Sequence, residues 1–256
     1  MSKHWFVIVC ITLLTGCASW RTITVTDPRT GVEYTVDRQF NYLPGIEGLA
    51  KACAEEAGQT ITQVVEVEGY YNDNWSECEG NCVQWLVEYD FNYIELNVTD
   101  IKPYSAIKQP GIWKVFKAPK DHPHCNRRMT ELLDKHGKDE FLKTACLVAQ
   151  KQETIESRYG VYFETEEKYL LDGEWVTLDQ IDQTKVRVDE IPYLLKQNQK
   201  IIDHKNGSPM AEVIRIMLLP KPLKIPNNIE CQQIQINQVN GFNEKNILLP
   251  NIRKGD

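Results

Sequence analysis

Residues 122–152 read HPHCNRRMTELLDKHGKDEFLKTACLVAQKQ, and this stretch decides the predicted fold. Its first half places apolar side chains and Cys125 on one helical face, and Gly137 then ends that helix. Asp139 is suited to cap a second helix, which runs to the end of the stretch and carries Cys146 on its inner face. In an antiparallel pair the two cysteines differ in level by only ~5 Å, and packed helices bring facing α-carbons within disulfide range. The stretch therefore predicts a helical hairpin linked by a Cys125–Cys146 disulfide.

Strand-like patterns lie on both sides of this hairpin. Before it, residues 21–36 read as two strands around a DPRTG turn, and apolar side chains alternate with polar ones over residues 83–93. A helix is predicted over residues 44–57, and after the hairpin Asp172-Gly173 is a strong turn dipeptide between two strands. Further predicted elements are strands over 61–70, 111–116, 186–188 and 213–219 and a short helix over 191–202. Together these patterns predict an α+β fold: mainly antiparallel strands in two groups, with the disulfide-linked helical hairpin between them.

The N-terminus carries a separate pattern. Lys3 supplies a positive charge, and residues 5–14 form an uncharged apolar stretch that is too short for a membrane span of ~20 residues. The stretch ends in Leu14-Thr15-Gly16-Cys17, which resembles the lipobox of bacterial lipoproteins. The alternative is an ordinary secretory signal that happens to contain a cysteine.

The resemblance to lipoproteins implies a lipid anchor on Cys17. Signal peptidase would cleave before this residue, its sulfur would carry a diacylglyceryl group, and the freed amine would be acylated. Ala18 and Ser19 follow, and resemblance to the enterobacterial sorting pattern favours the outer membrane, with the folded part facing the periplasm. The partner implied by the anchor is the membrane itself, and an envelope protein is a second expected partner.

The predicted signal peptide and lipid anchor account for two of the cysteines. Of eight cysteines, cleavage removes Cys10 and lipid occupies Cys17, which leaves six. An even number in an exported protein predicts disulfides, because the periplasm is oxidising. Besides Cys125–Cys146, two pairings remain as guesses, namely Cys78–Cys82 by proximity and Cys53–Cys231 by elimination.

The patterns divide the chain into four regions. They are a signal peptide (1–16), a β-rich region with one helix (17–120), the helical hairpin (121–157) and a second β-rich region (158–256). Three prolines within residues 102–120 mark the boundary before the hairpin, although the three mature regions are also compatible with one domain.

The composition limits the classes of function. A chain of 256 residues with 42% hydrophobic and 25% charged side chains is typical of a globular protein. The formal charge of -7 argues against non-specific binding to nucleic acid, which needs clustered Lys and Arg. We therefore expect no nucleic-acid partner.

One cluster has the residue types of a metal site. It consists of Asp121, His122, His124 and Cys125, with His136 one helix length further on. Zinc uses imidazole and thiolate ligands. Two histidines on either side of a proline, however, point in different directions, and Cys125 is expected in a disulfide. We assign no metal ligand here.

A second cluster has the residue types of a cysteine nucleophile. Residues 80–85 (GNCVQW) resemble the nucleophile segment of papain-like hydrolases, with Cys82 as nucleophile and His122, His124 or His136 as base. Such a thiol needs a lowered pKa, usually at a helix N-terminus, whereas Cys82 opens a predicted strand and has Cys78 as a disulfide partner. The structural interpretation is favoured, and no catalytic or cofactor-binding residue is assigned.

Two surface features allow binding as well as structural interpretations. The aromatic strand 83–93 could line a pocket for an acyl chain or a glycan ring, or it could be half of an ordinary packed sheet. A basic stretch interleaved with Tyr104, Trp113 and Phe116 could meet lipid head groups or an acidic partner, or it could guard an edge strand. Its lysines are Lys102, Lys108, Lys114, Lys117 and Lys120.

The sequence favours a non-catalytic binding or scaffolding lipoprotein of the envelope. It contains no Walker, GxGxxG, GxSxG, HExxH or SxxK motif. The first alternative is a periplasmic hydrolase that uses Cys82 and a histidine. The second alternative is an immunity or inhibitor lipoprotein.

Overall fold

The computed structural model describes residues 22–73, 86–99, 101, 105–135, 137–219, 228–237 and 246–251. The predicted signal peptide, Cys17, Cys78, Cys82 and His136 lie outside the described residues. In the part of the chain that is described, no helix is long and apolar enough to cross a membrane.

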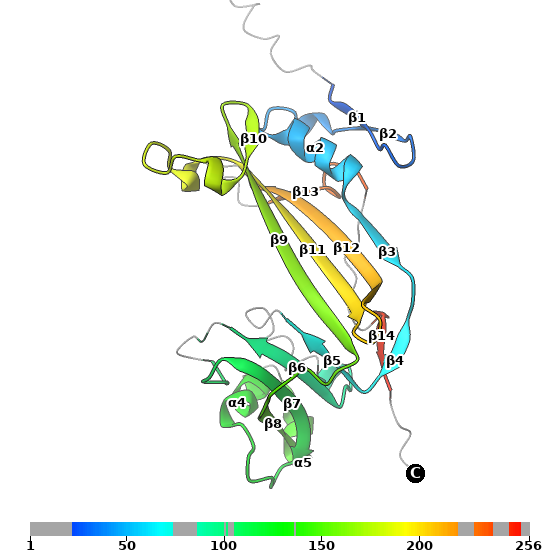
Figure 1. Cartoon of the computed structure of the whole chain (residues 1–256), viewed down its shortest axis with the longest axis vertical. Helices are drawn as coiled ribbons and strands as arrows, with labels where there is room; N and C mark the ends of the chain where they lie inside the picture. Colours follow the sequence, from blue (N-terminus) through cyan, green and yellow to red (C-terminus); the bar gives the residue numbers. More distant parts are fainter. Residues whose placement is uncertain are drawn as a thin grey trace, which may run out of the picture. The chain divides into compact units, whose positions relative to one another are not determined.

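The described residues are mostly strands, with few helices (Figure 1). The strands are β1 (Thr24–Thr26), β2 (Glu33–Thr35), β3 (Gly58–Ile61), β4 (Val65–Val67), β5 (Gly69–Asn72), β6 (Tyr93–Val98), β7 (Gly111–Pro119), β8 (Ala145–Gln152), β9 (Tyr159–Leu171), β10 (Glu174–Val176), β11 (Tyr193–Asp203), β12 (Ser208–Leu219), β13 (Ile229–Glu230) and β14 (Leu248–Pro250). The helices are α2 (Ile46–Glu55), α4 (Arg127–Lys135) and α5 (Asp139–Thr144), with 3-10 turns η1 (Arg38–Phe40), η2 (Leu178–Gln180) and η3 (Val188–Glu190).

Most strands belong to one mixed sheet. Its order is β13-β12-β11-β9-β5-β6-β7-β8, with β10 paired to β9 and β3 paired to β12. Strand β5 pairs in parallel with both β6 and β9, whereas β7 pairs antiparallel with β6 and β8. Strands from before and after the predicted hairpin are therefore neighbours in one sheet, and do not form the two groups that the sequence predicts.

The chain forms two compact units, and the boundaries between them fall within β3, β9, β11 and β12. Unit 1 contains residues 22–58, 165–198, 213–219 and 228–237, and unit 2 contains residues 59–164, 199–212 and 246–251, less the gaps given above. Each unit is thus assembled from stretches that are far apart in the sequence.

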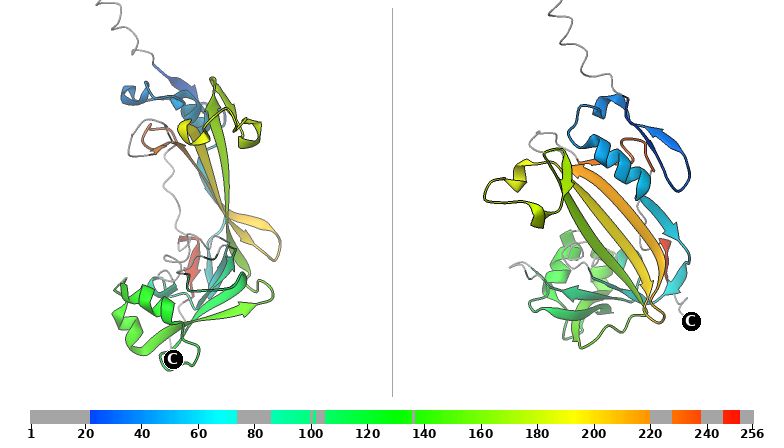
Figure 2. Two further views of the ribbon diagram at one scale, coloured as in Figure 1. Left: turned by 90° about the vertical axis from the view of Figure 1, so that its left-hand side faces the viewer. Right: turned by 45° about the horizontal axis from the view of Figure 1, so that its top comes forward.

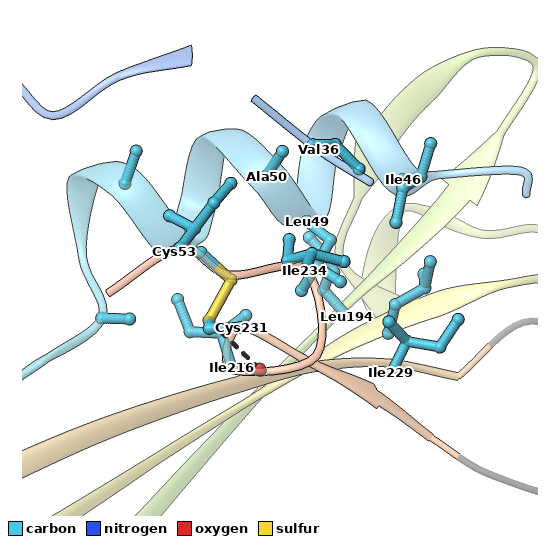
Figure 3. Packing of buried hydrophobic residues seen from close by; sticks show 14 of the residues in the cluster. Val36, Ile46, Leu49, Ala50, Cys53, Leu194, Ile216, Ile229, Cys231 and Ile234 are labelled. Carbon is cyan, nitrogen blue, oxygen red and sulfur yellow. Dashed lines mark hydrogen bonds between the residues drawn. A yellow bond between two sulfur atoms is a disulfide. The ribbon is translucent and has the colours of Figure 1, made fainter. Parts of the chain in front are cut away.

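Helix α2 lies at the centre of the unit 1 core. Its buried side chains recur every three or four residues, and they are Ile46, Leu49, Ala50, Cys53 and Ala54. They pack against Leu194, Ile216 and Ile229 from β11, β12 and β13 (Figure 3). Figure 2 shows α2 (blue) beside one end of β12 (orange). The helix predicted over residues 44–57 is confirmed.

A disulfide fastens this core. Cys53 of α2 is bonded to Cys231 in the turn after β13, and the two residues are 178 positions apart in the sequence. Both are buried, and the Cys231 sulfur lies 3.5 Å from the carbonyl oxygen of Ile216 (Figure 3). Because the crosslink closes a long loop, it removes much of the conformational entropy of the unfolded chain.

The C-terminal end of α2 has its own polar partners. Arg29 Nη2 donates to the carbonyl oxygens of Ala54 and Ala57 at 3.1 and 2.9 Å, and Asn237 Nδ2 donates to that of Cys53 at 2.9 Å. These bonds satisfy carbonyls that a helix end leaves without partners. Buried Asp27 accepts hydrogen bonds from both donors, and the bond from Arg29 lowers the pKa of Asp27 to about 2.

The predicted helical hairpin is only partly present in unit 2. Helix α5 ends at Thr144, and the prediction of a helix beyond that residue is wrong: Ala145–Gln152 is strand β8. This strand pairs antiparallel with β7 over eight positions. Cooperative pairing with a neighbouring strand prevails here over the helical spacing of a few apolar side chains.

The Cys125–Cys146 disulfide is present, but it joins different elements from those predicted. Cys125 lies in the turn before α4 and forms a bridge with Val148, whereas Cys146 lies on β8. The two cysteines pack with Val148, Ala118 and Phe116 on one face of the β7–β8 pair. The bond therefore fastens the start of α4 to the sheet.

The strand predicted over residues 83–93 is wrong in its described part. Leu86–Glu88 is helical, and β6 begins only at Tyr93. Leu86 occupies a position that the alternation assigns to solvent, yet it is fully buried, as is Phe91. Asp90 has a φ of 60°, which ends any extended conformation between them.

Two later elements also differ from the sequence prediction. The helix predicted over residues 191–202 is strand β11, which lies between β9 and β12, and the strand predicted around 186–188 gives way to the turn η3. Tertiary pairing on both sides overrides the helical propensity of Leu, Lys and Gln in β11. The hairpin over 21–36 and the turn at Asp172-Gly173, where φ is 51° and 88°, are confirmed.

The two disulfides should differ in their contribution to stability. The loops that they close have sequence separations of 178 and 21 residues, which correspond to about 5 and about 3 kcal/mol of unfolded-state entropy. We expect the double variant Cys53→Ala/Cys231→Ala to lower the urea midpoint of unfolding more than Cys125→Ala/Cys146→Ala does. Equal losses, or a larger loss from the shorter loop, would contradict this.

Candidate functional site

A pocket of about 180 Å³ lies in unit 1 between α2, the β9–β10 hairpin, β11 and β12. Its lining residues come from four stretches of the chain. They are Gly48, Lys51, Ala52, Glu55, Glu56, Glu166, Lys168, Trp175, Leu194, Lys196 and Ile216. The pocket therefore combines apolar groups with a charged rim.

Trp175 forms one wall of the pocket. The turn at Asp172-Gly173 places it on β10 opposite Leu170 of β9, and from there its indole reaches the backbone of α2. A β-carbon added to Gly48 would lie 2.2 Å from the indole Nε1, so only glycine permits this close approach.

The floor of the pocket is aliphatic. Leu194 of β11 and Ile216 of β12 are almost fully buried and belong to the same core cluster as α2. Ala52 lies on the helix beside them and is partly buried. A small side chain at this position leaves the space open, so the pocket continues the core of unit 1 toward the surface.

The rim carries three lysines and three glutamates, and they pair with one another. Lys51 Nζ lies 3.9 Å from Glu55, Lys168 Nζ lies 3.3 Å from Glu166, and Lys196 forms an ion pair with Glu56. The formal charges balance, so the rim selects neither a cation nor an anion. It is suited to an apolar group whose surroundings are polar.

The size of the pocket limits what it holds. An apolar protein cavity of ~150 Å³ takes one benzene-sized molecule, whereas sites for drug-sized ligands measure ~300–1,000 Å³. At about 180 Å³, this pocket fits a single ring or one branched side chain.

Of the histidine cluster considered from the sequence, the structure describes Asp121, His122, His124 and Cys125 but not His136. The rings of His122 and His124 touch edge to face at 5.8 Å, and Cys125 is bonded to Cys146, so it provides no thiolate. Among the described residues, no group of three or more His, Cys, Asp or Glu could hold a metal ion. Cys82 and His136 lie outside the described residues, so the structure does not test the nucleophile hypothesis.

Of the basic stretch, Lys114, Lys117, Trp113 and Phe116 lie on β7, whereas Lys102 and Tyr104 lie outside the described residues. In the structure β7 is not an edge strand. It pairs with β6 on one side and β8 on the other. Lys114 contacts Glu156 at 3.1 Å and lies 4.2 Å from the centre of the Tyr93 ring, while Lys117 pairs with Asp90. These lysines neutralise neighbouring carboxylates, so they do not form a free cationic surface.

Sequence reasoning missed the pocket. The Asp-Gly turn that positions Trp175 was identified, but no local motif connects that tryptophan with Gly48 or with Ile216. Comparisons with protein-family models, with curated proteins and with solved structures found no match to this chain.

The contact between Gly48 and Trp175 can be tested by a double-mutant cycle. Alone, Gly48→Ala should destabilise the protein, because the new methyl group displaces the indole. In a Trp175→Leu background the same change should be neutral or should stabilise by up to about 1 kcal/mol, since alanine favours the helix. The measurement is the free energy of unfolding in urea, and the same effect of Gly48→Ala in both backgrounds would refute the contact.

Proposed function

We propose that this chain is a lipid-anchored lipoprotein of the bacterial envelope that binds an envelope protein and catalyses no reaction. The anchor is the lipid on Cys17, and Ala18 and Ser19 favour the outer membrane, with the folded units facing the periplasm. The observation that supports binding is the pocket beside Trp175, which is apolar within, balanced in charge at its rim and large enough for one side chain.

A protein partner fits this pocket better than a free small molecule or an acyl chain. Protein interfaces depend on a few anchor side chains that fill pockets and are surrounded by polar groups that exclude water. The paired Lys and Glu of the rim provide such surroundings, and an indole wall suits an aromatic or branched aliphatic anchor.

The disulfides support the same compartment. Cys53–Cys231 and Cys125–Cys146 would be rare in a reducing cytosol and persist in an oxidising periplasm. Both are structural, since each fastens a helix or its start to neighbouring strands.

The lipid anchor has a matched control within the chain. We expect Cys17→Ser to abolish labelling by an alkyne-bearing fatty acid and to release the protein from the membrane fraction. Cys10→Ser, which changes a cysteine in the segment to be cleaved, should leave both properties unchanged. Label retained in Cys17→Ser, or lost in Cys10→Ser, would disprove the anchor.

The binding role can be tested by site-specific photo-crosslinking of the full chain in its native cells. Lys51 at the pocket rim and Lys185 elsewhere in unit 1 are both exposed and each pairs with a nearby carboxylate. We expect a photoreactive side chain at position 51, but not at 185, to give a discrete protein adduct. Filling the pocket with Ala52→Trp should remove that adduct.

Three outcomes would contradict the proposal. One is the absence of a protein adduct from position 51, and another is the same adduct from position 185. The third is an adduct that survives Ala52→Trp in a folded protein with both disulfides intact.

A further inference from the structure

Unit 2 contains a shallow, open hollow of about 520 Å³. The residues that matter for its chemistry are Ile155, Arg158, Tyr162, His204 and Lys205. None of them lines the pocket beside Trp175, so the hollow is a separate site.

Arg158 is held in one orientation at this hollow. Its Nε and Nη2 donate to both carboxylate oxygens of Asp203, at 3.1 and 2.8 Å, and its guanidinium lies 5.0 Å from the centre of the Tyr159 ring. Asp203 is buried, and its hydrogen bond with Arg158 lowers its pKa, so it remains ionised at neutral pH. A guanidinium fixed in this way loses little entropy when it binds a further group.

Two donor groups at the hollow, Arg158 Nη1 and the Lys205 ammonium, have no partner among the described residues. The Arg158 side chain is half exposed, and within the described residues its Nη1 has no acceptor. Lys205 is exposed, and in the same part of the chain its ammonium forms no ion pair. The end of the Arg158 fork can therefore hold the two oxygens of a carboxylate, while Lys205 adds a second positive charge.

Two rings form a wall beside these donors. His204 Nδ1 donates to the carbonyl oxygen of Ser157 at 2.6 Å, and its Nε2 is hydrogen-bonded to the Tyr162 hydroxyl at 2.7 Å. Burial raises the pKa of Tyr162, which keeps that hydroxyl protonated. Gly160 makes room for both rings, because a β-carbon there would lie 2.5 Å from His204 Nε2.

The segment before Arg158 is hydrogen-bonded to a buried carboxylate, and Glu156, the one acidic residue among those that line the hollow, is paired with a lysine. Fully buried Glu95 accepts hydrogen bonds from the backbone amides of Glu156 and Ser157, the shortest at 2.8 Å. The Glu156 side chain lies 3.1 Å from Lys114 Nζ, so its charge is balanced outside the anion site.

We propose that this hollow binds a small organic acid, with its carboxylate on Arg158 and Lys205 and its apolar body against Tyr162 and Ile155. The guanidinium fork recognises the planar carboxylate, and the ammonium provides the remaining charge. The apolar body of the ligand packs against the Tyr162 ring and Ile155, which removes its apolar surface from water.

Titration calorimetry of the full mature chain in detergent tests this site, with benzoate as the probe and benzamide as its neutral analogue. We expect saturable binding of benzoate and at least tenfold weaker binding of benzamide, since the amide lacks the charge. Inorganic phosphate separates carboxylates from other oxyanions, and it should bind less tightly than benzoate because it has no apolar body.

Two variants locate the binding. Lys205→Gln removes an exposed positive charge and leaves the core unchanged. Arg158→Lys keeps the positive charge beside Asp203 but removes the guanidinium that would bind both carboxylate oxygens. Each variant should weaken benzoate binding at least tenfold. Lys120→Gln makes the same charge change at an exposed residue of unit 2 outside the hollow and should have no effect. Equal binding of benzoate to wild type and Lys205→Gln, equal binding of benzamide, or tighter binding of phosphate would overturn the assignment.

Discussion

The core of unit 1 is formed by the packing of α2 against β11, β12 and β13. The helix buries one apolar face in the core, shares a disulfide with the turn after β13 and delivers its terminal carbonyls to Arg29 and Asn237. The apolar face runs along the whole helix, whereas the disulfide and the hydrogen bonds act at its C-terminal end. The face of α2 opposite its buried side chains, with Gly48, Lys51, Ala52 and Glu55, forms a wall of the pocket.

The sequence predicts correctly those turns and helices whose conformation is determined by residues close together in the chain. The DPRTG and Asp172-Gly173 turns and the apolar spacing of α2 are of this kind, and all three are present. The helices predicted beyond Thr144 and over 191–202 are strands, because each segment lies beside partner strands that the sequence does not reveal. Leu86 is an example at a single residue. The alternation of apolar and polar side chains over 83–93 assigns it to solvent, yet it is buried and its segment is helical.

The candidate sites were less predictable than the fold. The pocket beside Trp175 joins residues from positions 48 to 216, and the hollow at Arg158 joins residues from 155 to 205. Lys and Glu at the pocket rim look like any solvated surface until the structure pairs them. The proposed carboxylate site at Arg158 depends on Asp203, which is 45 residues away in the sequence and binds one side of the guanidinium. Chemistry of this kind is created by tertiary structure and leaves no motif.

The discontinuity of unit 1 has a consequence for how the protein matures. Cys53 is synthesised 178 residues before its partner, whereas Cys146 follows Cys125 after only 21. An oxidase that joins thiols in order of their appearance would pair Cys53 with a nearer cysteine and trap it there. Correct maturation therefore requires that Cys53 stay reduced until the end of the chain arrives, or that thiol–disulfide exchange by an isomerase corrects the early error.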